Sequence, residues 1–121
     1  MHRIVYKVCT TAEWRAACAR GVYAGSADDH RDGFLHLSTA EQLAGTLSRH
    51  FAGRSDLVLA AFDAESLGEP LKWEPSRGGQ LFPHLYASLA PALALSVEPL
   101  PVAADGQHTL PDKLGQDPRP C

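Results

Sequence analysis

The first part of the chain changes from an apolar strand pattern to a helical one. Residues 4–8 are rich in β-branched and aromatic side chains, which predicts a strand. Thr10 and Glu13 then have the spacing of a capping box, in which each side chain accepts a hydrogen bond from the other residue's amide. We therefore expect a helix that starts at Thr10 and ends at Gly21. Its buried face has three side chains at helical spacing: Trp14, Ala17 and Cys18.

A second helix is predicted from residue 38 to about residue 51. Ser38 and Glu41 repeat the capping pattern, and Gly53 provides the stop. The apolar face of this helix consists of residues four apart: Leu43, Leu47 and Phe51. Residues 24–33 are rich in Gly, Ser and Asp, which favour turns. We expect a surface loop there.

Short apolar runs predict the strands. Residues 57–62 are continuously apolar, which is typical of a central strand buried on both faces. Residues 71–74 alternate between apolar and polar, Pro75 ends that strand, and 76–83 read as a loop with two consecutive glycines. Three further short strands are expected, at 34–37, 84–87 and 92–97.

The order of these elements predicts an α+β fold. Two helices lie in the N-terminal half and most strands follow them, so we expect one compact domain with a mixed or mostly antiparallel sheet over residues 1–102. Residues 103–121 carry several prolines and glycines and few large apolar groups. This composition predicts a poorly ordered C-terminal tail.

Length and charge favour a small-molecule partner over a polyanion. The chain has 121 residues, 45% of them hydrophobic, which suffices for one core. A net charge of −3 gives no general attraction for nucleic acid or for an anionic membrane. There is no signal-like start and no run of about 20 apolar residues. A cytoplasmic location is therefore expected.

The cysteines are irregularly spaced and suggest free thiols. Cys9, Cys18 and Cys121 match neither a disulfide framework nor a zinc motif, so we expect a reducing compartment.

Polar groups inside apolar runs mark the candidate site. On the strand 34–37 the period of two puts Phe34, His36 and Ser38 on one face. His84 and Tyr86 share a face of a later strand in the same way. An imidazole in such a position either finds a partner or faces a wet cleft, because burying an unpaired polar ring is costly. We therefore expect His36 and His84 to converge on a cleft, although either could be a core histidine bonded to a carbonyl.

Glu74 and Arg77 complete the candidate set. A carboxylate beside Trp73 suits proton transfer or the stabilisation of a cation, unless it is an exposed glutamate paired with Lys72 or Arg77. Arg77 precedes two glycines, so its guanidinium could bind a carboxylate or phosphate near the open backbone, although a plain hairpin turn fits equally. Two histidines and a carboxylate could also hold a metal ion, but no metalloenzyme spacing is present. Ser38 is explained by its capping role as well as by a site.

These segments together resemble a bacterial family, domain-of-unknown-function family 952. The likeness covers about residues 3–100 and includes the first strand with Tyr6-Lys7 and the helix with Trp14. Its more specific segments are Gly25-Ser26, Asp32 to Ser38, Trp73-Glu74 and Phe82 to Tyr86. The resemblance implies a compact fold similar to that of ADP-ribosyltransferases, with a central cleft between two halves of the sheet.

If that similarity extends to chemistry, it implies NAD as a substrate. No cofactor is certain. Glu74 would hold the ribose and stabilise the positive charge that develops as the nicotinamide bond breaks, and His36 would bond the ribose. Tyr86 or Phe34 would stack the nicotinamide, and Arg77 or Lys7 would meet the pyrophosphate. We thus predict a transferase-like enzyme that acts on NAD or another nucleotide, with His36, Glu74 and His84 as catalytic residues. The alternatives are a non-catalytic module that binds a small ligand and a protein-interaction domain.

Overall fold

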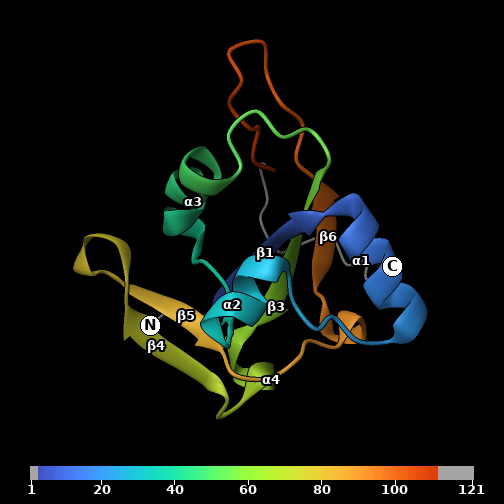
Figure 1. Ribbon diagram of the computed structural model, residues 1–121, viewed down its shortest axis with the longest axis vertical. Coiled ribbons are helices and arrows are strands. Elements are labelled where there is room, and N and C mark those ends of the chain that lie inside the picture. Colours follow the sequence, from blue (N-terminus) through green and yellow to red (C-terminus); the bar gives the residue numbers. More distant parts are fainter. Residues whose placement is uncertain (1–2, 112–121) are drawn as a thin grey trace.

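The computed structural model describes residues 3–111 and has two antiparallel sheets of three strands each (Figure 1). The first sheet has the order β1-β3-β6 and the second the order β2-β5-β4. The strands of the first sheet are β1 (Ile4–Thr10), β3 (Leu57–Asp63) and β6 (Ser96–Pro99). Those of the second are β2 (Leu35–His36), β5 (Leu81–Leu85) and β4 (Leu71–Pro75). The predicted α+β class is confirmed, and 57–62 is the central strand of its sheet.

Helices lie around these sheets. The α-helices are α1 (Thr11–Arg20), α2 (Ala27–Asp32), α3 (Leu43–His50) and α4 (Ala64–Leu67). Short 3₁₀ turns are η1 (Ala40–Gln42), η2 (Arg77–Gly79) and η3 (Pro91–Leu93). In Figure 1, α1 lies at one side of the β1-β3-β6 sheet, while α3 and the β4–β5 hairpin lie at the other. Among the described residues, no helix is long and apolar enough to cross a membrane.

The alternation of β1 builds two cores at once. Val5 and Cys9 face one cluster, which also contains Trp14 and Phe62. Tyr6 and Val8 face a second cluster that includes residues of α3 and β3: Leu43, Leu47, Leu57, Leu59 and Ala61. Lys7 lies between Val5 and Cys9 in the pattern of two, so its side chain is directed into the first cluster and is buried. A charged group there needs a partner.

A backbone bridge joins the two sheets. Tyr6 N donates to Ser38 O at 2.8 Å, and Ser38 N donates to Tyr6 O at 2.9 Å. Ser38 follows β2 directly, so this bridge connects β1 of one sheet with the end of β2 in the other. The two sheets therefore diverge from the neighbourhood of Tyr6 and Ser38.

Several predicted boundaries are wrong. The expected loop at 24–33 contains α2, because Ser26 and Asp29 form a capping box that the composition concealed. Ser38 is not a helix cap: Thr39 and Gln42 form the capping box, and the helix starts as η1. The last strand begins at Ser96 after η3, not at 92. The strand expected at 84–87 lies at Leu81–Leu85, and Pro75 belongs to β4.

The cysteine prediction is also wrong in part. Cys18 is disulfide-bonded, whereas Cys9 is a buried free thiol. Burial raises the pKa of Cys9 to about 12, so this thiol stays protonated and unreactive at neutral pH. The expected reducing compartment loses the support of free thiols and remains a prediction.

Residues 103–111 have partners in the structure. Ala103 N donates to Gln107 O at 2.8 Å, and His108 Nε2 lies 2.6 Å from Arg54 O. Leu110 packs against the second cluster. The rest of the predicted tail, 112–121, lies outside the described residues.

Gly25 gives a test of local packing. It has a φ of 116°, and a Cβ there would lie 2.8 Å from Leu35 Cδ2 and 2.9 Å from Asp29 Cβ. We expect Gly25→Ala to lower the free energy of unfolding by roughly 2–4 kcal/mol, since both backbone strain and overpacking contribute. Urea denaturation measures it. Gly53→Ala, with a φ of 74° and no atom within 4 Å, is the control and should cost only about 1 kcal/mol. Equal losses would contradict the packing argument.

Candidate functional site

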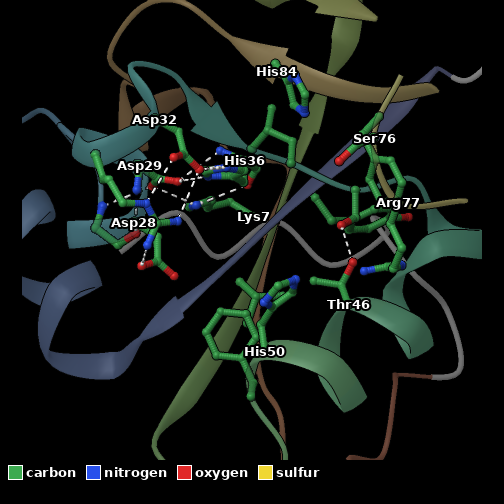
Figure 2. Close-up of a pocket in the computed structure, with 18 residues that line it drawn as sticks. Lys7, Asp28, Asp29, Asp32, His36, Thr46, His50, Ser76, Arg77 and His84 are labelled. Carbon is green, nitrogen blue, oxygen red and sulfur yellow. Dashed lines mark hydrogen bonds and ion pairs between the residues drawn. The ribbon is translucent and has the colours of Figure 1, made fainter. Parts of the chain in front are cut away.

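A pocket of about 260 Å³ lies where the two sheets meet (Figure 2). Tyr6 and Ser38, which make the bridge between the sheets, both line it. Other lining residues come from α2, α3, the η2 turn and β5. Figure 2 shows three aspartates on one side, Ser76 and Arg77 on the other, and His84 and His50 at opposite edges. The pocket thus collects side chains from segments far apart in the sequence.

A buried ion pair forms one wall. Lys7 Nζ lies 2.8 Å from Asp29 Oδ2, with side chains only 5% and 1% exposed. Lys7 also donates to His36 O at 3.0 Å, and Ser26 N donates to Asp29 Oδ2 at 2.9 Å. Burial alone would raise the pKa of Asp29, but the hydrogen bond from His36 and the charge and hydrogen bond of Lys7 outweigh it and hold that pKa well below its usual range. Asp29 is therefore a buried anion.

His36 lies between two carboxylates of α2. Its Nδ1 is 2.6 Å from Asp29 Oδ1, and its Nε2 is 2.9 Å from Asp32 Oδ2. The His36 amide also donates to Asp29 Oδ1 at 3.0 Å. Asp29 thus fixes both the backbone and the ring of His36.

His84 is held by Glu74, a residue of the neighbouring strand β4. Its Nδ1 lies 2.8 Å from Glu74 Oε1, and Tyr86 donates its hydroxyl to the same oxygen at 2.8 Å. These two hydrogen bonds, with that from His84 the larger contribution, lower the pKa of Glu74. Within residues 3–111 no hydrogen bond is made to His84 Nε2. This nitrogen is the group that His84 can offer to a ligand.

Phe34 holds the two histidines together. It stacks on His84 with centroids 4.0 Å apart and an angle of 23°, and it lies 4.8 Å from the His36 ring. The rings of His36 and His84, direct partners across β2 and β5, are 5.9 Å apart. Tyr86 also contacts Phe34, at 5.3 Å. The aromatic residues therefore support the imidazoles from behind.

Arg77 places a positive charge on the side of the pocket that lies across from the aspartates (Figure 2). Its guanidinium lies 4.9 Å from the centre of the Phe82 ring, and in the described part of the chain it pairs with no carboxylate. It also lies against Gly45 of α3, where a Cβ would come within 3.0 Å of Nη2. Partial burial and the nearby Arg77 lower the pKa of His50. The Arg77 side of the pocket therefore suits an anion.

The site predicted from the sequence is brought together only in part. Five of its residues line the pocket: Lys7, His36, Ser38, Arg77 and His84. Phe34, Glu74 and Tyr86 do not line it and lie behind the imidazoles instead. Lys7 forms an ion pair with Asp29, and Ser38 Oγ lies 2.9 Å from Thr46 Oγ1, so both side chains already have partners within the protein. The catalytic and binding roles given to these residues remain predictions.

The sequence reading missed the residues of α2 and α3. The composition of residues 24–33 predicts a loop at Asp28, Asp29 and Asp32, and no local pattern marks Thr46 or His50, yet all five line the pocket. The spacing of Ser26 and Asp29 is the signal that could have placed α2 beside β2. No group of three or more His, Cys, Asp or Glu side chains within 3–111 is arranged to hold a metal ion.

Comparisons with known proteins place the chain in a family. The model of a family described as protein of unknown function (DUF952) matches residues 8–97. The chain belongs to the DUF952 family. No curated protein matches it.

Solved structures of protein CC0527 from Caulobacter crescentus share the fold. Its crystal structure is 48% identical, with a TM-score of 0.86 over 88% of this chain and 94% of that one. Its solution NMR structure is 49% identical, with a TM-score of 0.78 over 86% and 90% of the two chains.

Asp29→Asn tests the buried pair. The substitution leaves Lys7 buried without its counter-ion, so we expect the free energy of unfolding at pH 7 to fall by about 3–5 kcal/mol. Urea denaturation measures it. Asp56→Asn, which breaks an exposed pair with Arg54 at 2.9 Å, is the control and should change little. Similar losses of unfolding free energy in both variants would contradict the claim that the contribution of Asp29 to stability depends on its burial.

The pH dependence of stability is a second test of Asp29. Its pKa is lower in the folded state than in the unfolded chain, so its contribution is complete above about pH 5 and decreases as the pH falls through the ordinary aspartate range near pH 4. We expect unfolding free energies measured from pH 7 to pH 3 to fall more steeply for the unmodified chain than for Asp29→Asn. Parallel curves would show that Asp29 is not the anion that the site depends on.

Proposed function

We propose that the pocket binds a nucleotide or another small phosphate-bearing molecule and that the protein is a transferase-like enzyme acting on it. One observation carries this proposal. His84 lines the pocket with its Nδ1 bonded to Glu74, while its Nε2 has no hydrogen-bond partner among residues 3–111.

A carboxylate on Nδ1 prepares His84 for proton transfer. Glu74 accepts the Nδ1 hydrogen and so fixes the tautomer in which Nε2 carries the lone pair. An imidazole held in this way can take a proton from a reacting group, or return one to it, within hydrogen-bond reach of the pocket. In this proposal Glu74 is a positioning residue, because it reaches the ligand only through His84.

Arg77 supplies the recognition of phosphate. A guanidinium offers two parallel donors to a phosphate, and Arg77 has no carboxylate to compete for them within 3–111. Its contacts with the Phe82 ring and with Gly45 hold it at the pocket without neutralising it. An anionic ligand would therefore find its favourable charge and hydrogen-bond donors at the Arg77 side of the pocket, and not at the side of the aspartates.

The size of the pocket limits the ligand. Small-molecule pockets range from about 300 to about 1,000 Å³. At about 260 Å³, this pocket suits a mononucleotide or one half of a dinucleotide. NAD would place one of its halves inside and leave the other in solvent.

The resemblance to ADP-ribosyltransferases keeps NAD among the candidate substrates. In that chemistry a carboxylate stabilises the positive charge of the opening ribose. Glu74, the residue that the resemblance assigns to this role, does not line the pocket and is bonded to His84 and Tyr86. This position favours the second candidate function, a module that binds a nucleotide without converting it.

Calorimetric titration with AMP and NAD tests the binding. We expect both to bind, and Arg77→Gln to weaken the affinity about tenfold or more, because charge-assisted hydrogen bonds to phosphate are lost. Arg49→Gln is the matched control, since this exposed arginine of α3 does not line the pocket. No heat with millimolar ligand would refute the proposal.

Incubation of the bound nucleotide tests the enzyme against the binding module. We expect conversion of the nucleotide, measured by chromatography, with release of nicotinamide as the readout for NAD. Glu74→Gln should slow it at least about tenfold while the affinity changes little, because the Nδ1 partner of His84 is weakened. A ligand recovered unaltered would leave only the binding module.

A further inference from the structure

One cation that lines the pocket, Arg77, has no carboxylate partner within residues 3–111. The acidic residues that line the pocket are Asp28, Asp29 and Asp32, and each already has a cationic partner. Lys7 pairs with Asp29 at 2.8 Å, and Arg31 pairs with Asp28 at 3.1 Å and with Asp32 at 3.0 Å. Arg77 has no such partner within 3–111. The Arg77 side of the pocket therefore suits negative charge that develops in a transition state.

Two imidazoles face this pocket from paired strands. His36 and His84 are direct cross-strand partners of β2 and β5, and their ring centres are 5.9 Å apart at an angle of 72°. In each ring Nδ1 is held by a carboxylate, Asp29 at 2.6 Å and Glu74 at 2.8 Å. Within the described residues His84 therefore presents a free Nε2, whereas Nε2 of His36 lies 2.9 Å from Asp32 Oδ2.

The two rings differ in their hydrogen-bond partners. Both nitrogens of His36 face carboxylate oxygens, so its contacts are satisfied when both nitrogens carry hydrogen. His84 needs only one hydrogen, on Nδ1, and keeps the lone pair of Nε2. His36 is thus arranged as a proton donor and His84 as a proton acceptor.

From this asymmetry we propose that the protein hydrolyses a small phosphodiester of a nucleotide, with His84 as general base and His36 as general acid. The proposal rests on the proposed binding of a nucleotide and names the bond that is broken. A cyclic mononucleotide fits the size of the pocket. Arg77 would bind the non-bridging phosphate oxygens, on which negative charge increases in the transition state.

The reaction needs only water as co-reactant. His84 Nε2 takes a proton from a water molecule as its oxygen bonds to phosphorus. The bond between phosphorus and the ester oxygen breaks, and His36 Nε2 gives its proton to the departing oxygen. The products are a phosphomonoester and an alcohol, and the two histidines return to their first states by exchanging one proton with solvent.

Asp32 has a defined part in this step. Its carboxylate occupies His36 Nε2, the position that the leaving oxygen would take. Asp32 is the last residue of α2 and its side chain is 34% exposed, so it can turn to solvent with its partner Arg31. Asp32 is a positioning residue that occupies Nε2 of His36 until the substrate replaces it.

The test uses the full chain and 2′,3′-cyclic AMP in water enriched in ¹⁸O, with products followed by ³¹P NMR. We expect hydrolysis above the rate in buffer, with one ¹⁸O in the phosphate group. His36→Gln and His84→Gln should each reduce kcat about 100-fold or more. His30→Gln should leave kcat unchanged, because this exposed histidine of α2 does not line the pocket.

A pH profile keeps the test valid even if a histidine variant fails to fold. We expect a bell-shaped profile of kcat/KM for the unmodified chain. The groups around His36 are Asp29, Asp32, Lys7, His50 and His84; those around His84 are Glu74, Lys72, Tyr86 and His36. Asp32→Asn removes a negative charge beside the acid, so the alkaline limb should move to lower pH. Glu74→Gln removes one beside the base, so the acid limb should move to lower pH.

Three outcomes overturn the inference. They are no hydrolysis of the cyclic ester, label in the ribose instead of the phosphate, and limbs that stay in place in both variants. AMP that still binds in the calorimeter would then leave the proposed nucleotide pocket standing. Absence of AMP binding together with absence of hydrolysis would remove both proposals.

Discussion

The buried pair of Lys7 and Asp29 is the interaction on which the arrangement of the site depends. Two charges removed from water are stable only when their hydrogen bonds are satisfied, and here they are. Lys7 contacts Asp29 and the His36 carbonyl, and Asp29 accepts from the His36 amide and ring and from Ser26. The pair therefore joins β1, α2 and β2, three segments that share no sheet hydrogen bonds at this point.

The position of Lys7 in β1 determines where the pocket opens. Its neighbour Tyr6 makes the backbone bridge to Ser38, so the buried pair and the junction of the two sheets adjoin each other. His36, two residues before Ser38, is consequently held at the same junction. The cross-strand pairing of β2 with β5 then brings His84 beside it, with Phe34 packed against both rings. The ion pair of Lys7 with Asp29 and the register of β2 against β5 together bring the two imidazoles to the same pocket.

The electrostatics of this pocket differ from those implied by the likeness to ADP-ribosyltransferases. Glu74 is bonded to His84 and does not line the pocket, and the three aspartates of α2 share two cationic partners, Lys7 and Arg31. Among the described residues that line the pocket, Arg77 is the cation without a carboxylate partner. Two proteins can share a fold and a cleft and still differ in the reaction that the cleft supports, because function depends on the side chains of the site and not on the architecture.

The sequence by itself determined the strand of residues 57–62 and the first helix with its Thr10 cap, and it predicted that His36 and His84 converge on a cleft, which both of them line. These depend on local periodicity, on capping and on the cost of burying a polar ring. It could not show that Lys7 is neutralised by Asp29, that Glu74 lies behind His84, or that Arg77 remains unpaired. Those facts depend on strand register and on the packing of α2, which bring together residues far apart in the chain. Only the tertiary structure decided which charges face the pocket, because a charge's effect is set by its partners in space.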